Sequence, residues 1–278
     1  MLKPKQSLGQ NFLRDPNTIR RIVAALQAPE GAPVVEIGPG TGALTEVLLE
    51  VHPSLTAIEV DGRAVELLQE QFPSLDVRHQ DVLEVDWMAL AAERGGPLHV
   101  IGNLPYYITS PILFSLLDAQ ARLASESERA DVREAVVPEN VVREAVVMMQ
   151  LEVAERLVAV PRTKAYGILS VLFQLYATPE LLFRLSPHVF FPKPSVTSAV
   201  VRLAFHAASS LPAGDEAERL RAVVRAAFNQ RRKTLRNSLH RWTREGGLHL
   251  PEGWERRRAE ELTPAEFVEL TRHLGRQA

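Results

Sequence analysis

The chain has 278 residues, of which 46% are hydrophobic, and a formal net charge of −2. This length can bury a full core and leave material for one small extra domain. The chain has no cysteine, which excludes disulfides and thiolate chemistry, and its His, Asp and Glu residues show no metal-ligand spacing. The first residues lack the apolar stretch of a signal peptide, and no apolar run has membrane-spanning length. We therefore expect a cytoplasmic protein that works without a bound metal.

The first predicted element is a helix that begins near residue 16. Asp15 suits its N-cap, Pro16 suits its first turn, and apolar residues recur at helical spacing from Ile19 to Leu26. Residues 10–13 precede this helix and are placed to fold over a bound ligand. Taken alone, the same segment could equally be a disordered arm.

A strand, a glycine-rich turn and a helix follow. Residues 33–37 form an apolar run, residues 38–42 read Gly-Pro-Gly-Thr-Gly, and a helical apolar pattern begins at Leu44. Glycine lets the backbone approach a ligand closely, so the pattern is typical of a nucleotide-binding βα unit. The spacing differs from the G-x-G-x-x-G of dinucleotide sites, which argues against a pyrophosphate cradle.

Two acidic residues follow the next two predicted strands. Residues 55–58 lead to Glu59, whose carboxylate is placed to accept hydrogen bonds from ribose hydroxyls. The same acid occurs in NAD sites, so it does not identify the cofactor. Residues 76–79 lead to Asp81, which could accept a hydrogen bond from an adenine amine, although an isolated Asp there is more typical of a cap.

The most informative residues are Asn103-Leu104-Pro105-Tyr106, which come after the apolar run 98–101. The Asn103 side-chain oxygen and a neighbouring backbone carbonyl can accept the two hydrogens of an exocyclic amine. Pro105 fixes the backbone there, and Tyr106 can stack on a base, a contact worth roughly 1–3 kcal/mol. In isolation, an ordinary strand-to-helix turn explains the tetrapeptide about as well.

The order of these features along the chain decides between the two interpretations. Gly38, Glu59, Asp81 and Asn103 each end one of four successive predicted strands. Open parallel sheets bind their ligands at the carboxyl ends of the strands. The series therefore favours a purine-binding site over an ordinary turn.

Five stretches closely resemble the ribosomal RNA adenine dimethyltransferases, and within them the KsgA (RsmA) branch. They span nearly the whole chain in order, which makes the resemblance specific. The stretches are GQNFL at 9–13, VEIGPGTG at 35–42, NLPYYITSP at 103–111, FFPKPSVTS at 190–198 and FNQRRKTLRN at 228–237.

This resemblance implies an α/β fold: a Rossmann-like class I methyltransferase domain with a seven-stranded, mostly parallel sheet, and a small all-helical C-terminal domain. It also implies an S-adenosylmethionine-dependent monomer that dimethylates two adjacent adenosines near the 3′ end of 16S rRNA in the 30S particle. The family's cofactor contacts fall on Asn11, Leu13, Gly38, Glu59, Asp81 and Asn103. Its target-base site falls on Asn103, Leu104, Tyr106 and Phe190, which leaves Phe191 as the variable position of its motif.

Charge is distributed unevenly along the chain. Residues 1–32 carry +3, residues 33–201 carry −10 and residues 202–278 carry +5. Basic ends suit a protein that grips RNA phosphates. We expect one continuous helical face to present cations to rRNA, although a solvated helix face is the usual meaning of such a pattern. The expected RNA-binding residues are Arg221, Arg225, Arg231, Arg232, Lys233 and Arg236.

A domain boundary is predicted near residue 206. Small and turn-forming residues occupy 207–214, after a strand at 200–203 and before helices resume near Glu216. Strands alternate with helices before that point, and only helices are predicted after it. The predicted domains are therefore a methyltransferase domain at 1–205 and a helical rRNA-binding domain at 206–278.

One stretch departs from the family. Ser125 to Asn140 is charged and loop-like, and the hexapeptide VREAVV at 132–137 recurs at 142–147. The second copy leads into the predicted fifth strand, so the first is interpreted as a surface insertion or a helix extension. Leu151 also stands where the family usually has Lys, so no contact from that position is carried over from the family.

Other functions were weighed against 16S rRNA dimethylation. Methylation of an adenosine in large-subunit rRNA or in DNA uses the same chemistry, and the stretch at 228–237 argues against it. A ribosome-maturation factor that docks without catalysis is disfavoured by the intact Asn103 to Tyr106 run. A NAD oxidoreductase is disfavoured because its chemistry has no use for that turn.

Overall fold

The computed structural model describes residues 2–5, 9–129 and 138–276, without the side chains of residues 244 and 245. The chain folds into two compact units. Unit 1 comprises Met1–Gln120, Val136–Ala154 and Glu180–Phe205, and unit 2 comprises Ala121–Ala135, Glu155–Pro179 and His206–Ala278. Unit 2 thus recruits chain from before residue 206, and the functional division at 205/206 stays a prediction.

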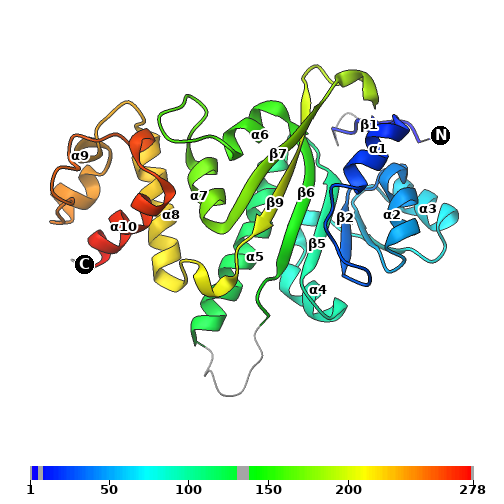
Figure 1. The fold of residues 1–278 in the computed structure, drawn as a ribbon, viewed down its shortest axis with the longest axis horizontal. Coiled ribbons are helices and arrows are strands. Elements are labelled where there is room, and N and C mark those ends of the chain that lie inside the picture. Colours follow the sequence, from blue (N-terminus) through cyan, green and yellow to red (C-terminus); the bar gives the residue numbers. More distant parts are fainter. Residues whose placement is uncertain (1, 6–8, 130–137, 277–278) are drawn as a thin grey trace. The chain divides into compact units, whose positions relative to one another are not determined.

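Within the described residues, a seven-stranded sheet forms the centre of unit 1 (Figure 1). The strands from β4 to β6 run parallel, and β9 is antiparallel to β6, which confirms the expected mostly parallel sheet. Their order is β4 (Asp76–His79), β3 (Thr56–Glu59), β2 (Val34–Ile37), β5 (Leu98–Asn103), β6 (Val142–Gln150), β9 (Ser198–Phe205) and β7 (Ala177–Leu185).

Helices cover this sheet because successive strand residues point to opposite faces, and the central strands β2, β3, β5 and β6 are buried on both faces. In Figure 1, α1 (Pro16–Val23) and α2 (Ala43–Val51) lie beside each other next to β2. Side chains from α1, α2 and α3 (Gly62–Gln71) share one core cluster with the strands. The other helices between β4 and α7 are α4 (Trp87–Arg94), α5 (Thr109–Arg129) and α6 (Leu151–Leu157).

The N-terminal segment joins unit 1 through a second, two-stranded sheet. In it, β1 (Phe12–Leu13) pairs antiparallel with β8 (Phe190–Phe191), so that Leu13 lies opposite Phe190. The α1 start is confirmed, because the Asp15 carboxylate accepts a hydrogen bond from Thr18 N at 2.8 Å and Pro16 occupies the first turn.

In unit 2, the described residues form helices, turns and the first residues of β7, and one isolated bridge joins Thr234 and Arg258. Its core contains Phe228, whose ring stacks on Phe267 and meets Tyr166 edge to face. None of the described helices is long and apolar enough to span a bilayer. The helices that lie wholly in unit 2 are α7 (Ile168–Tyr176), α8 (Gly214–Asn229), α9 (Leu235–Ser238) and α10 (Pro264–Gly275).

Short helical turns occur in both units. They lie at Val82–Glu84, Pro187–Val189, Ala208–Ser210, Arg241–Glu245 and Ala259–Glu261.

The prediction of one continuous basic helix face in unit 2 is wrong. Helix α8 ends at Asn229, and Gln230 takes a non-helical conformation with φ −123° and ψ 53°. Lys233 N then donates to the Gln230 carbonyl at 2.7 Å, which makes a turn before α9. The cations before and after Gln230 therefore belong to separate elements.

The prediction of a loop from Ser125 is wrong in part, because α5 extends through Arg129. Arg122 and Glu126 form an i,i+4 ion pair at 3.0 Å, and Ser125 Oγ donates to the Ala121 carbonyl. The first VREAVV copy lies outside the described residues. The second copy lies in β6, as expected.

Candidate functional site

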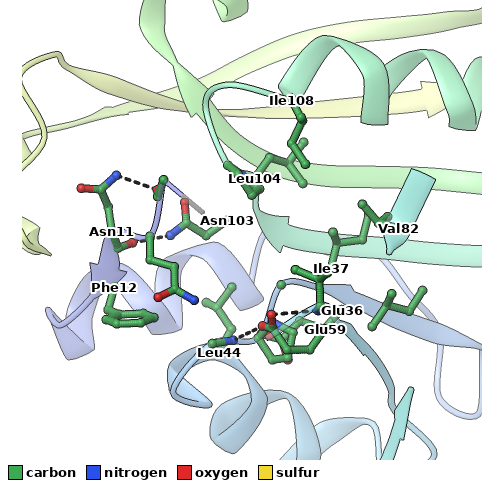
Figure 2. Close-up of a pocket in the computed structure, with 18 of the residues that line it drawn as sticks. Asn11, Phe12, Glu36, Ile37, Leu44, Glu59, Val82, Asn103, Leu104 and Ile108 are labelled. Carbon is green, nitrogen blue, oxygen red and sulfur yellow. Dashed lines mark hydrogen bonds between the residues drawn. The ribbon is translucent and has the colours of Figure 1, made fainter. Parts of the chain in front are cut away.

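A single pocket gathers most of the predicted site residues at the carboxyl ends of the parallel strands (Figure 2). All six expected cofactor contacts line it: Asn11, Leu13, Gly38, Glu59, Asp81 and Asn103. Leu104 and Tyr106 of the expected target-base site also line it, whereas Phe190 does not. The series read along the sequence thus converges in space.

The glycine turn brings the backbone close to the pocket. Gly38 and Gly40 have φ of 65° and 58°, in the left-handed region that side chains avoid. A Cβ on Gly40 would lie 2.9 Å from Cε1 of Phe12, another residue of the pocket wall. Glycine at position 40 is therefore required by both the conformation and the packing of the N-terminal segment.

Glu59 is held by backbone amides. Its Oε1 accepts hydrogen bonds from Val60 N and Asp61 N, both at 2.9 Å, and its Oε2 accepts one from Gly40 N at 3.0 Å. The side chain is buried, and burial raises the pKa of the Glu59 carboxyl while these hydrogen bonds oppose the rise. Oε2 retains an unoccupied lone-pair site, so a diol at the pocket would meet an acceptor of fixed direction.

A second acid, Glu36, lines the same pocket and is 1% exposed. Burial raises the pKa of the Glu36 carboxyl to about 8, although the hydrogen bond from Thr45 Oγ1 to its Oε2 at 2.7 Å acts in the opposite direction. The nearby Glu59 charge adds to the rise. Burial therefore favours the protonated form of Glu36, which reduces its repulsion of the Glu59 carboxylate.

Asp81 is both a cap and a pocket residue, the two roles that its sequence position allowed. Its Oδ1 accepts a hydrogen bond from Leu83 N at 2.9 Å and caps the turn Val82–Glu84. The same residue lines the pocket next to Val82. Capping holds the carboxylate through Oδ1, and no described residue donates to Oδ2.

The orientation of the Asn103 amide is set by a residue 92 positions away. Its Nδ2 donates to the Asn11 backbone carbonyl at 2.8 Å, as Figure 2 shows. The described residues supply no hydrogen-bond donor to its Oδ1. The Pro105 carbonyl is occupied by Ile108 N and Thr109 Oγ1, whereas no described donor reaches the Leu104 carbonyl. Asn103 Oδ1 and Leu104 O are therefore two available acceptors in adjacent residues.

Tyr106 is anchored at its hydroxyl, which shares a short hydrogen bond with Ser198 Oγ at the start of β9. Burial raises the pKa of the Tyr106 phenol, so the ring stays neutral over the physiological range. With its edge fixed, the ring can offer its face to a flat ligand.

Of the two adjacent phenylalanines of β8, the one expected at the target base is the buried one. Phe190, the predicted second ring of the target-base site, is 5% exposed and belongs to the core cluster, whereas Phe191 is 45% exposed. The Arg14 guanidinium lies 3.9 Å from the centre of the Phe191 ring. Strand pairing puts neighbouring side chains on opposite faces, which explains the contrast. The role of Phe190 at the target base stays a prediction.

The expected RNA-binding residues lie in unit 2 and divide into two kinds. Arg231 is committed to the fold: its guanidinium donates to Glu260 Oε2 at 2.8 Å and to the carbonyls of Thr163 and Lys164. Arg221 is half-buried in α8. The others are exposed: Arg225, Arg232, Lys233 and Arg236.

Gln10 lines the pocket, as expected for the segment 10–13. Two residues of this region were not recognised from the sequence: Ser198 holds the Tyr106 hydroxyl, and Asp61 accepts a hydrogen bond from Gln10, in the segment that carries Asn11. Their positions in sequence carry weak signals, since Asp61 before a helix is typical of an N-cap and nothing more. Contacts between distant segments reveal them.

Comparison with known proteins places these features in a family. The family model described as ribosomal RNA adenine dimethylase matches residues 1–274. The "Ribosomal RNA small subunit methyltransferase A" of Salinibacter ruber is 56% identical over 99% of this chain and 86% of its own length. That of Prosthecochloris aestuarii is 45% identical over 96% of this chain and 92% of its own.

Solved structures agree on the fold. A dimethyladenosine transferase from Plasmodium falciparum superposes with a TM-score of 0.73 at 21% identity, covering 96% of this chain and 98% of its own. The 23S rRNA methyltransferase ErmE superposes with a TM-score of 0.65 at 26% identity, covering 95% of this chain and all of its own. The expected class I methyltransferase fold is thereby confirmed. With a family model matching almost every residue and a relative that shares more than half of them, the chain belongs to the ribosomal RNA adenine dimethylases.

Proposed function

We propose that this enzyme transfers methyl groups from S-adenosylmethionine to the 6-amino groups of two adjacent adenosines near the 3′ end of 16S rRNA in the 30S particle. The observation that carries the proposal is the pair of acceptors, Asn103 Oδ1 and the Leu104 carbonyl, that no described donor occupies, in two residues that line the pocket. An amine with two hydrogens fits two acceptors of this kind. The relatives named for small-subunit rRNA support the choice of RNA.

The pocket fits an adenosyl cofactor. Its turn at Gly38 and Gly40 admits close approach of a ligand, and the fixed Glu59 carboxylate suits a ribose diol. Asp81 offers a carboxylate oxygen beside the apolar Val82, a pairing that suits the amine and the face of a purine. S-adenosylmethionine supplies a methyl group on a positively charged sulfur, which needs no further activation.

The chain's own residues prepare the attacking nitrogen. The lone pair of an adenine amine is delocalised into the ring, which makes the amine a weak nucleophile. Hydrogen bonds from its two hydrogens to Asn103 Oδ1 and Leu104 O favour a tetrahedral nitrogen with a directed lone pair. These acceptors also stabilise the positive charge that develops on the nitrogen during transfer. Positioning and electrostatics then supply most of the acceleration.

The target base must leave its helix to reach this site. Tyr106, fixed through Ser198, offers a ring on which a flipped adenine can stack, and that contact offsets part of the unstacking cost. Phe190 remains the proposed second ring. Because the side chain is buried against Leu13 in the paired strand, contact with the base requires local movement of β8.

Affinity for the RNA is assigned to the basic helical region. The exposed cations Arg225, Arg232, Lys233 and Arg236 suit phosphate contacts. Arg221 is half-buried, and Arg231 is bonded to Glu260 and two carbonyls, so both are proposed as weaker RNA contacts. Residues 206–278 would then act as the rRNA-binding domain and residues 1–205 as the methyltransferase domain. We further propose that the enzyme acts as a monomer in the cytoplasm, where its substrate particle is assembled.

One comparison tests the proposal. The protein is incubated with labelled S-adenosylmethionine and either 30S particles or 50S particles, each lacking the modification, and with duplex DNA as a third substrate. We expect label on two adjacent adenosines of 16S rRNA only. Label on 23S rRNA would favour an ErmE-like substrate, label on DNA would favour a DNA adenine methyltransferase, and binding without label would favour a docking factor.

A further inference from the structure

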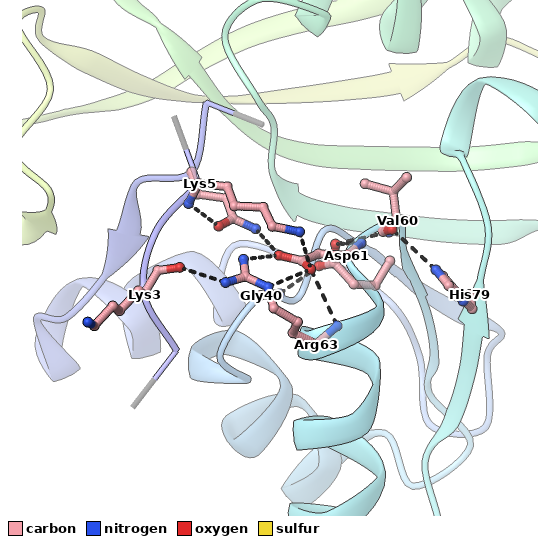
Figure 3. Close-up of polar contacts among 9 residues, drawn as sticks. Lys3, Lys5, Gly40, Val60, Asp61, Arg63 and His79 are labelled. Carbon is pink, nitrogen blue, oxygen red and sulfur yellow. Dashed lines mark hydrogen bonds and ion pairs between the residues drawn. The ribbon is translucent and has the colours of Figure 1, made fainter. Parts of the chain in front are cut away.

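Asp61 is buried at 2% exposure, yet every side chain that contacts it comes from a more exposed position. Arg63 donates to it from Nε at 3.0 Å and from Nη2 at 2.6 Å. Lys5 Nζ donates at 3.2 Å and Gln10 Nε2 at 3.1 Å, as Figure 3 shows for Lys5 and Arg63. A buried carboxylate with this many donors stays ionised and holds its partners in place.

Two of these partners belong to the N-terminal arm, defined here as the described residues 2–5 and 9–11. Lys5 N also donates to Gln10 Oε1 at 2.8 Å, and Arg63 Nη1 donates to the Lys3 carbonyl at 3.3 Å. Asp61 thus holds the arm directly through two side chains and indirectly through Arg63. Asp61, which lies between β3 and α3, is therefore an anchor of the arm.

The arm ends at Asn11, whose carbonyl accepts the Asn103 Nδ2 hydrogen bond. An Asn side chain has nearly the same shape after a half-turn that exchanges its oxygen and nitrogen. Without the Asn11 carbonyl, the amide could present its NH₂ group to the target amine instead of its oxygen. A donor facing a donor would abolish the proposed hydrogen bond.

The contacts form an uninterrupted chain around the pocket. Asp61 N donates to Glu59, the Asp61 carboxylate holds Gln10, Gln10 precedes Asn11, and the Asn11 carbonyl holds Asn103. Residues of the arm also form part of the pocket wall. The acid that meets the cofactor ribose and the amide that meets the target base are therefore linked through the arm.

We propose that Asp61 is a positioning residue for methyl transfer, which keeps the Asn103 amide oxygen directed at the target amine by anchoring the N-terminal arm. It acts on the reaction through Asn103 and touches neither substrate. The inference rests on the proposed function, since it assigns Asn103 Oδ1 the acceptor role. Beyond that function, it explains what orients the Asn103 amide, namely the arm that Asp61 anchors.

Asp61 is also the N-cap of α3, accepting from Arg63 N at 3.3 Å, so the test must separate the two roles. Asn caps helices about as well as Asp. We therefore choose Asp61→Asn, which keeps the cap and weakens the hold on Lys5 and Arg63. Gln10→Ala removes an arm contact without touching the cap. Asp86→Asn, at the N-cap of α4, is the matched control for replacing a capping carboxylate.

The experiment is a double-mutant cycle on the single-turnover rate of methyl transfer, at saturating cofactor and 30S particles. We expect Asp61→Asn to lower that rate at least tenfold and Gln10→Ala to lower it severalfold, with cofactor affinity by calorimetry changed less than the rate. Asp86→Asn should leave the rate unchanged. In the Asn103→Ala background, Asp61→Asn should have little further effect.

Additive losses in that cycle would overturn the inference, because they would show that Asp61 acts independently of Asn103. A raised cofactor dissociation constant with an unchanged single-turnover rate would also overturn it, since the arm would then hold only the cofactor. If Asp61→Asn fails to fold, the cycle of Gln10→Ala with Asn103→Ala decides in the same way. Absence of transfer by the unaltered enzyme would instead reject the proposed function.

Discussion

The pocket of unit 1 and the basic surface of unit 2 use polar residues in opposite ways. In the pocket, Glu59 and Asn103 are each held by backbone groups, so a particular atom faces the ligand. On unit 2, exposed cations such as Arg232 and Arg236 lie on a turn and a short helix. Direction matters in the first case and charge in the second. Single substitutions should therefore have large effects in the pocket and small, additive effects on the basic surface.

The largest effect is expected for Asn103→Ala. Removing one of two positioned acceptors should lower turnover by ~10²–10³, comparable to the loss of one oxyanion-hole donor in other enzymes. Cofactor binding, measured by calorimetry, should stay largely intact. Asn17→Ala, on the exposed face of α1, is the control and should behave as the unaltered enzyme. Normal turnover of the Asn103 variant would remove this residue from the mechanism.

The second prediction is that Glu36 makes the stability of the folded chain depend on pH. Its folded pKa of about 8 exceeds the ordinary glutamate value of 4.5, so the folded chain keeps a proton that the unfolded chain releases. Stability should therefore fall as pH rises from about 4.5 to about 8, and level off above that. Glu36→Gln should remove this part of the pH dependence, on the order of a few kcal/mol. Urea unfolding midpoints across that pH range give the measurement, and parallel curves for the two proteins would contradict the assignment.

Much of this arrangement follows from local sequence. The parallel strands were predicted because apolar runs ending in Gly38, Glu59, Asp81 and Asn103 repeat along the chain, and these residues do line one pocket. A local pattern fixes where a strand ends, and the sheet then brings the ends together.

The sequence fails where a residue's state depends on a distant partner. Nothing near Asn103 indicates that the Asn11 carbonyl orients its amide. Which of Phe190 and Phe191 is buried depends on the pairing of β8 with β1, far away in the chain. The break after α8 accompanies the contact of Arg231 with Glu260, 29 residues later, which a helical periodicity cannot register.

A smaller loss in the pocket is expected for Tyr106→Ala. Base stacking on an aromatic ring is worth roughly 1–3 kcal/mol, so use of the RNA substrate should weaken about tenfold to a hundredfold. Tyr106→Phe keeps the ring and loses only the hydrogen bond to Ser198, so its loss should be severalfold. KM for 30S particles and the cofactor dissociation constant are the measurements. Equal losses in both would place the ring on the cofactor.

The smallest effects per residue are expected on the basic surface. Replacing Arg232 and Arg236 together by Ala should weaken RNA binding modestly and flatten the slope of log affinity against log salt by about 1.5, as expected for two lost phosphate contacts. Arg231→Ala is the matched control, because its guanidinium is bonded to Glu260 and two carbonyls. It should lower the unfolding midpoint and leave the slope unchanged. A flatter slope for Arg231→Ala alone would mean that this arginine leaves its partners to bind RNA, and the contrast between a structural and a phosphate-binding cation on this surface would be lost.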